Sequence, residues 1–284
     1  MPSFPIIDSH VHIYDPGYLT YHWMKDVPRL NKPHLMTDFT RLTAGVEVDK
    51  IVFVEVDVAA HQHLDEARWV ALQAQMDNRL RGMVASMPLE KGAAVEADLA
   101  TYAEMAIARG ARRLIESHPQ PGWCLREAFV EGVKLLPKYG LTFDLCLFHR
   151  QLSEVIQLVR LCPEVKFIVD HIAKPAIKAG ITEPWRGQMR MLAKLPNVWC
   201  KISGVVTEAD HLAWTAEQVI PYVAHAIDCF GFDRVLFGGD WPVSELATTY
   251  KGWVDLVDRA VAGSSEAEIR KLYRDNAIEF YRLK

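Results

Sequence analysis

Short runs of apolar residues alternate with longer segments of helical periodicity along the chain, and this alternation limits the folds that it can adopt. Several runs are continuously apolar, such as Ile51-Val52-Phe53-Val54 and Phe167-Ile168-Val169. Strands that are buried on both faces have this composition, and they form parallel sheets covered by helices. Strands are predicted at 6–12, 50–58, 80–88, 111–117, 141–147, 165–172, 198–204 and 234–242.

The segments between these runs have the periodicity of amphipathic helices. Apolar residues recur at i, i+3, i+4 and i+7 from Leu152 through 151–161, and a similar pattern runs through 216–230. A last helix is expected to begin after Ser265, because Glu268 stands at the spacing of a capping box.

The alternation of strands and helices predicts a parallel sheet, and eight such units are the number that closes a barrel. No Gly-x-Gly-x-x-Gly motif follows the first strand, which disfavours a doubly wound sheet. We therefore expect an α/β protein, a single (β/α)8 TIM barrel whose one domain spans residues 1–284.

The composition disfavours several classes of protein. Hydrophobic residues make up 50% of the chain and charged residues 24%, so a large core is expected. The net charge is −4 and both signs are interspersed, which argues against a nucleic-acid partner. No stretch approaches the ~20 apolar residues of a membrane span. The five cysteines form no Cys-x-x-Cys pair and the N-terminus has no signal-like segment, so we expect a cytoplasmic protein.

Polar residues at the C-terminal ends of the predicted strands are candidate site residues, because the active sites of such barrels lie there. The first strand ends in His10 and His12, and alternation places both imidazoles on one side. Two nitrogen ligands at this spacing suit a divalent transition metal. The eighth run ends in Gly238-Gly239-Asp240, and a buried carboxylate is costly unless it is paired or coordinated. Asp240 is therefore the clearest candidate.

Other strands contribute further candidates, namely His149 after the fifth, His171 after the sixth and Lys201 in the seventh. Arg112 and Arg113 are adjacent on the fourth strand and face opposite ways, so at most one of them reaches the mouth.

Two acids have competing interpretations. Asp170 is interpreted as a structural acceptor that orients His171 or a loop. Glu116 either contacts a ligand or forms a salt bridge, and the sequence leaves both alternatives open.

Several motifs, in this order and spacing, resemble the amidohydrolase-2 type of the amidohydrolase superfamily, and within it the group of sugar lactonases and pyrone-dicarboxylate lactonases. The resemblance implies a TIM-barrel hydrolase that opens a small cyclic ester to a hydroxy acid. It also implies a catalytic role for Asp240 and site roles for His10, His12 and His171. The motifs are Asp8-Ser9-His10-Val11-His12, Asp170-His171 with Lys174-Pro175, Lys201-Ile202-Ser203-Gly204 and Gly238-Gly239-Asp240-Trp241-Pro242.

The chain departs from the binuclear members of the superfamily in one respect. Those members carry a lysine at the end of strand four that forms a bridging carbamate, whereas this chain has arginines and Glu116 there. We therefore expect at most one Zn²⁺ or Mn²⁺ ion, held by His10, His12 and Asp240, with His149 or His171 open as a further ligand. The lactonase group includes members that need no metal, so the requirement stays open.

Lactone hydrolysis needs a deprotonated water, a polarised carbonyl and a proton for the leaving oxygen. We expect Asp240 to activate water, and His171, His149 and Lys201 or a metal to polarise the carbonyl. The few arginines favour a neutral sugar-acid lactone, such as L-fucono-, L-rhamnono- or galactono-lactone, over a dicarboxylate. The predicted substrate-binding residues are Trp23, Arg113, Glu116, Asp144, Lys174 and Trp241.

Three alternatives remain at this stage. One is a lactonase for a dicarboxylate or another lactone of aromatic catabolism. Another is a zinc-dependent decarboxylase of the same superfamily, and the third is a catalytically silent barrel that only binds its ligand. The sequence does not determine the oligomeric state.

Overall fold

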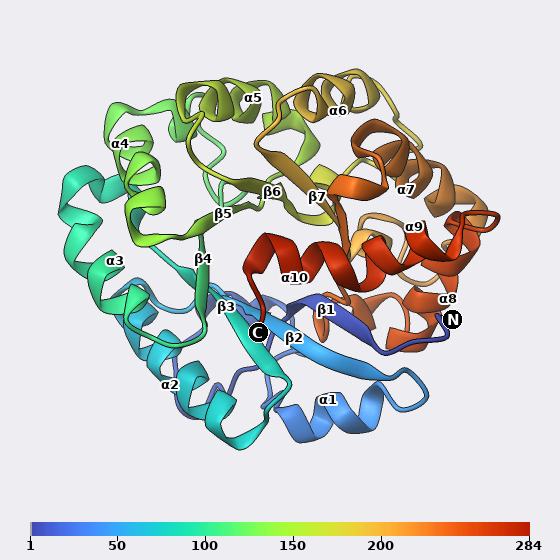
Figure 1. Cartoon of the computed structure of the whole chain (residues 1–284), viewed down its shortest axis with the longest axis horizontal. Coiled ribbons are helices and arrows are strands. Elements are labelled where there is room, and N and C mark those ends of the chain that lie inside the picture. Colours follow the sequence, from blue (N-terminus) through green and yellow to red (C-terminus); the bar gives the residue numbers. More distant parts are fainter. Residues whose placement is uncertain (1) are drawn as a thin grey trace.

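Eight strands of the computed structural model, which describes residues 2–284, form one parallel sheet in the order of the sequence (Figure 1). The sheet closes on itself, because a parallel bridge joins Val11 to Trp241 and the amide of Asp240 donates to the carbonyl of His10 at 2.8 Å. The predicted (β/α)8 barrel is confirmed. The strands are β1 (Ile6–Val11), β2 (Val48–Val54), β3 (Leu80–Ser86), β4 (Ala108–Arg112), β5 (Thr142–Leu145), β6 (Phe167–Val169), β7 (Val198–Ile202) and β8 (Val235–Phe237).

The fourth strand lies earlier in the chain than the predicted 111–117, since β4 begins at Ala108. It begins with Ala108, Arg109 and Gly110, which form no apolar run that would mark a strand. The packing requires a small residue in this strand, because a Cβ atom on Gly110 would lie 2.4 Å from Oγ1 of Thr142. The prediction was therefore wrong in its bounds, although the strand itself is present.

Helices surround the ring of strands, and α9 with α10 crosses one end of it (Figure 1). The predicted capping box is confirmed, since the amide of Glu268 donates to Oγ of Ser265 and the amide of Ser265 donates to Oε2 of Glu268. The α-helices are α1 (Met36–Leu42), α2 (His63–Met76), α3 (Glu96–Ala103), α4 (Glu127–Leu135), α5 (Leu152–Leu161), α6 (Trp185–Ala193), α7 (Ala216–Phe230), α8 (Tyr250–Ala260), α9 (Glu266–Arg270) and α10 (Asn276–Tyr281).

Short helical turns fill the connections. One of them, η11 (Lys271–Asp275), is a π-helical turn between α9 and α10. The others are η1 (His22–Asp26), η2 (Ala60–Gln62), η3 (Leu89–Val95), η4 (Trp123–Leu125), η5 (Leu136–Tyr139), η6 (His149–Gln151), η7 (Asp170–Ala173), η8 (Val205–Glu208), η9 (Phe232–Arg234) and η10 (Val243–Leu246).

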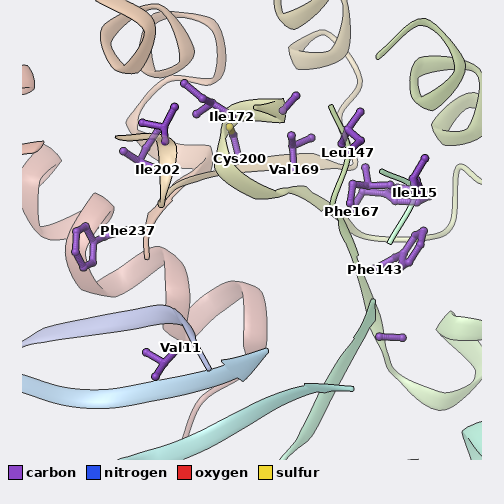
Figure 2. Close-up of a cluster of buried hydrophobic side chains, with 14 of the residues drawn as sticks. Val11, Ile115, Phe143, Leu147, Phe167, Val169, Ile172, Cys200, Ile202 and Phe237 are labelled. Atoms are coloured by element: carbon purple, nitrogen blue, oxygen red, sulfur yellow. The ribbon is translucent and has the colours of Figure 1, made fainter. Parts of the chain in front are cut away.

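Alternate strand residues belong to two apolar clusters. Phe167 and Val169 belong to the larger cluster, which also contains residues of the surrounding helices. Figure 2 shows both side chains among other buried residues of this cluster. Ile168, between them, belongs to a smaller cluster with Phe280 and Tyr281 of α10. The side-chain Nδ2 of Asn276 donates to the carbonyl of Val235, where β8 begins, so α10 covers the N-terminal ends of the strands. Only the opposite, C-terminal end of the barrel is left for a site.

No helix within residues 2–284 is long and apolar enough to cross a membrane.

Candidate active site

A cavity of about 300 Å³ lies at the C-terminal ends of the strands. It combines apolar side chains with both signs of charge, which is the usual character of a small-molecule site. Its lining residues are His12, Trp23, Glu55, Val56, Asp57, Arg112, Leu114, Glu116, Ser117, Cys146, His171, Lys174, Thr207, Asp240 and Val243.

The carboxylate of Asp240 lies among three imidazole rings at the base of this cavity. Its Oδ1 atom is 3.3 Å from Nε2 of His12 and 3.7 Å from Nε2 of His10. Nε2 of His171 lies 3.9 Å from the same oxygen. Burial by itself would raise the pKa of Asp240, but the imidazoles, that of His171 foremost, hold this pKa well below its usual range. The carboxylate is therefore ionised at neutral pH.

His12 is held in an orientation that suits a metal ligand. Its Nδ1–H donates to the carbonyl of Val54 at 2.8 Å, which leaves the lone pair of Nε2 facing Asp240 in the neutral ring. Two such acceptors 3.3 Å apart repel each other unless a cation or a proton lies between them.

The ligand atoms of His10, His12 and Asp240 lie within 4.8 Å of one another. Adjacent ligands of a tetrahedral zinc ion are about 3.3 Å apart when the bonds are about 2.0–2.1 Å long. The separations of 3.3 and 3.7 Å are close to this spacing. The three side chains that the sequence proposes as ligands therefore fit one divalent cation.

His171 faces Asp240 as a neutral hydrogen-bond donor. Burial is the main cause that lowers the pKa of His171. The hydroxyl of Ser203, on the seventh βα loop, lies 2.9 Å from Nδ1 of His171. When this hydroxyl donates to the neutral ring, the proton of His171 lies on Nε2 and points toward Asp240.

The segment that carries His171 has a strained backbone. Residues 171–174 have φ values of 52, 47, 62 and 45°, all in the left-handed region. This conformation costs about 1–2 kcal/mol for each non-glycine residue, and it is rare for a β-branched residue such as Ile172. The indole N–H of Trp185 donates to the carbonyl of Ile172 at 2.8 Å and helps to hold the turn. The turn brings both His171 and Lys174 to the cavity wall.

Beneath the imidazoles lies a fully buried ionic network. Nζ of Lys201 is 2.5 Å from Oδ2 of Asp144 and 3.1 Å from Oδ1 of Asp170, and all three side chains are 0% exposed. The hydroxyl of Tyr281 on α10 donates to Asp144 at 2.7 Å. Nζ of Lys201 also lies 3.3 Å from Nδ1 of His10. The network therefore connects the helix at the closed end of the barrel to a candidate metal ligand.

The structure brings Arg112, and not Arg113, to the cavity. Nε of Arg112 donates to Oε1 of Glu55 at 2.6 Å, and its NH1 donates to Asp170 at 3.2 Å. Arg113 faces away and pairs with Glu90 at 2.5 Å. The alternation of the two arginines is as the sequence predicts, whereas the choice of Arg113 as a substrate contact has no support in this placement.

Trp23 and Glu116, two of the predicted substrate-binding residues, line the cavity. The indole N–H of Trp23 donates to the carbonyl of Val56 at 2.8 Å, which orients the ring. Oε2 of Glu116 lies 2.5 Å from Nζ of Lys174. Glu116 therefore forms a salt bridge and also lines the cavity, so the two interpretations of this residue are compatible.

The amidohydrolase family profile matches residues 7–283, which is almost the whole chain. The chain belongs to the amidohydrolase superfamily. The resemblance that the motifs carry is thus confirmed over the length of the barrel.

Named relatives of this amidohydrolase include two lactonases. L-fucono-1,5-lactonase of Burkholderia ambifaria is 28% identical over 289 residues, covering 98% of this chain and 95% of the relative. L-rhamnono-gamma-lactonase of Scheffersomyces stipitis is 22% identical over 338 residues, covering 100% of both chains. A crystal structure of an amidohydrolase from Burkholderia multivorans with bound zinc is 27% identical, with a TM-score of 0.88 over 99% of this chain and 100% of that one.

Other predicted site residues of this amidohydrolase lie away from the cavity surface. His149 in η6 is half-buried and does not line the cavity. Trp241 is fully buried, with its ring against His34 and Phe39. Asp144 and Lys201 lie in the buried network below the cavity.

Three charged residues at the cavity were not predicted as site residues, namely Glu55, Asp57 and Arg112. Glu55 directly follows β2 and Asp57 comes two residues later, so the rule that polar residues at strand ends form the site would have found them.

Proposed function

We propose that this amidohydrolase opens a neutral sugar-acid lactone, such as a fucono-, rhamnono- or galactono-lactone, to the aldonic acid. The observation that carries the proposal is the ionised Asp240 carboxylate facing three imidazoles at the base of the cavity. The lactonases among the relatives support the same reaction class.

The chain supplies a proton acceptor and a hydrogen-bond donor for the carbonyl side by side at the cavity base. Asp240 accepts a proton from the attacking water, and Nε2–H of His171 donates to the carbonyl oxygen as negative charge develops there. When the ring opens, Asp240 returns the proton to the leaving oxygen. Water and substrate bind in the cavity that both of these side chains line.

The low pKa of Asp240 makes it a weak base, so the water must be acidified by its surroundings. His10, His12 and Asp240 would hold the divalent cation whose fit is described above. When bound, such a cation supplies a lowered pKa for water and a polarised carbonyl. Val54 and Asp170 contact the far nitrogens of the two histidines and would keep their rings oriented.

The charges at the cavity favour a neutral substrate over a dicarboxylate. Bidentate arginine is the usual reader of a carboxylate, but Arg112 is already engaged by Glu55 and Asp170. Lys174 is likewise paired with Glu116. Trp23 and neighbouring apolar side chains provide a surface for the ring of the lactone.

The proposal is tested by assaying the purified protein against a panel of aldonolactones, with and without a strong chelator, alongside analysis of bound metal. We expect turnover of one stereochemical series, lost on chelation and restored by Zn²⁺ or Mn²⁺. Full turnover by protein shown to be metal-free would overturn the metal assignment, whereas the proposed lactonase activity would still hold. Failure to hydrolyse any lactone, with or without added metal, would overturn the proposed function.

Gly204→Ala should damage the same site without a change of charge. A Cβ atom at Gly204 would lie 2.1 Å from Oδ2 of Asp240 and 2.8 Å from Nδ1 of His171, so both groups must move. A displacement of about 1 Å at a catalytic group lowers turnover roughly 10²-fold, and we expect a loss of that order in kcat/KM. Gly180→Ala is the matched control, because Gly180 also has a positive φ but has nothing within 4 Å of its Cβ position. Equal activity of the two variants would contradict the expected crowding.

A further inference from the structure

Asp57 differs from the other charged residues around the cavity. Glu55 pairs with Arg112, and Glu116 pairs with Lys174. Within residues 2–284, by contrast, the carboxylate of Asp57 forms no ion pair and accepts no hydrogen bond. Its negative charge therefore has no protein partner, although the side chain lines the cavity and is half-buried.

The backbone around Asp57 is held in place by neighbours, and not by its own carboxylate. Its amide donates to Oε2 of Glu55 at 2.7 Å, and Glu55 is in turn fixed by Arg112 at 2.6 Å. The preceding carbonyl, that of Val56, accepts from the indole of Trp23. Asp57 itself has a φ of 52°, in the left-handed region that aspartate tolerates better than most residues. The carboxylate is thus free to meet a ligand.

The surroundings of Asp57 favour a hydroxyl group as its partner. Burial, and then the charge of Glu55, raises the pKa of Asp57 to about 6, so its carboxylate is partly desolvated but ionised at neutral pH. Such a group is stabilised when a donor approaches it, and it repels an anion. Trp23, hydrogen-bonded next to it, offers a flat apolar face on the same wall.

We propose that Asp57 is a specificity-determining residue that accepts a hydrogen bond from one hydroxyl of the substrate ring. This inference rests on the proposed lactonase function and assigns the β2 loop, with Trp23, as the wall that recognises the sugar. It also explains why a lactone that carries a free carboxylate on its ring is disfavoured, because that carboxylate would face the unpaired charge of Asp57.

The test combines variants with deoxy substrates. Asp57→Gly removes the carboxylate and tolerates the positive φ, and Asp57→Asn keeps the shape in case the glycine variant does not fold. Both are assayed on the aldonolactone that the wild type prefers and on its monodeoxy analogues. Asp65→Ala is the control, since Asp65 pairs with Arg68 on the exposed face of α2.

Hydrogen bonds to charged groups contribute about 1.5–3 kcal/mol, so we expect kcat/KM for the parent lactone to fall roughly 10- to 100-fold in Asp57→Gly. For one monodeoxy lactone, kcat/KM of the wild type should be lower than for the parent lactone by a similar factor. The Asp57→Gly variant should show no further decrease in kcat/KM on that analogue. An equal loss on the parent and on every analogue would show a structural role and overturn the proposal. No loss on the parent would overturn it as well. The proposed lactonase function itself fails only if the wild type hydrolyses no lactone.

Discussion

Asp240→Asn is expected to lower kcat/KM for the preferred lactone by roughly 10²–10⁴-fold, the range that a positioned acid or base contributes. The amide keeps the shape of the carboxylate but cannot accept the proton of water or return it to the leaving oxygen. It also removes the negative charge that faces the imidazoles of His10, His12 and His171. A lowered affinity for Zn²⁺ should accompany the loss of turnover, because one of three ligands is weakened.

Circular dichroism and thermal unfolding establish whether the Asp240→Asn protein is folded, and steady-state kinetics measure the loss. Asp255→Asn serves as the matched control, since Asp255 forms a surface ion pair with Lys251 on α8 and neither residue lines the cavity. A folded Asp240→Asn protein with the turnover of the control would exclude Asp240 as the proton acceptor.

Lys201→Met is expected to lower the free energy of unfolding by about 3–5 kcal/mol, the usual cost of removing one partner from a buried ionic group. Methionine fills a similar volume but leaves Asp144 and Asp170, both 0% exposed, without the ammonium that neutralises them. Burial already raises the pKa of Asp144 to about 6 against the opposing effect of Lys201. Without Lys201 this pKa should rise further.

Urea denaturation at neutral pH measures the cost, and Lys178→Met is the comparison. Lys178 pairs with Asp210 at 2.9 Å on the surface, where its side chain is 69% exposed, so its loss should cost at most about 1 kcal/mol. The destabilisation of Lys201→Met should also shrink at acid pH, where the two aspartates become protonated and need no counter-charge. Equal destabilisation of the two variants would show that the network does not stabilise the fold in this way.

The order of the strands and the convergence of the principal candidates were predictable because both depend on local rules. Continuous apolar runs mark strands that are buried on both faces, and parallel strands share one C-terminal end. Alternation along β1 predicts that His10 and His12 face the same side, and their rings lie 4.9 Å apart. Asp240 could be placed at the same end because it follows the last apolar run.

The tertiary structure decided which way each remaining polar residue faces. Adjacent Arg112 and Arg113 must point to opposite sides, but only the register of β4 against its neighbours determines that Arg112 turns inward. Lys201 was predicted to lie at the mouth of the barrel, yet it is buried below the cavity. Asp144 on β5 and Asp170, directly after β6, neutralise it there.

The sequence by itself therefore determined the barrel, the end at which the site lies and the cluster of His10, His12 and Asp240. Only the tertiary structure determined which charged residues form ion pairs, because these pairs join side chains from strands that are far apart in the chain. Asp57 illustrates the difference, because nothing in its local sequence distinguishes it from any other polar residue after a strand. Its neighbours Glu55 and Arg112 satisfy each other across 57 residues of chain, and Asp57 is left unpaired at the cavity.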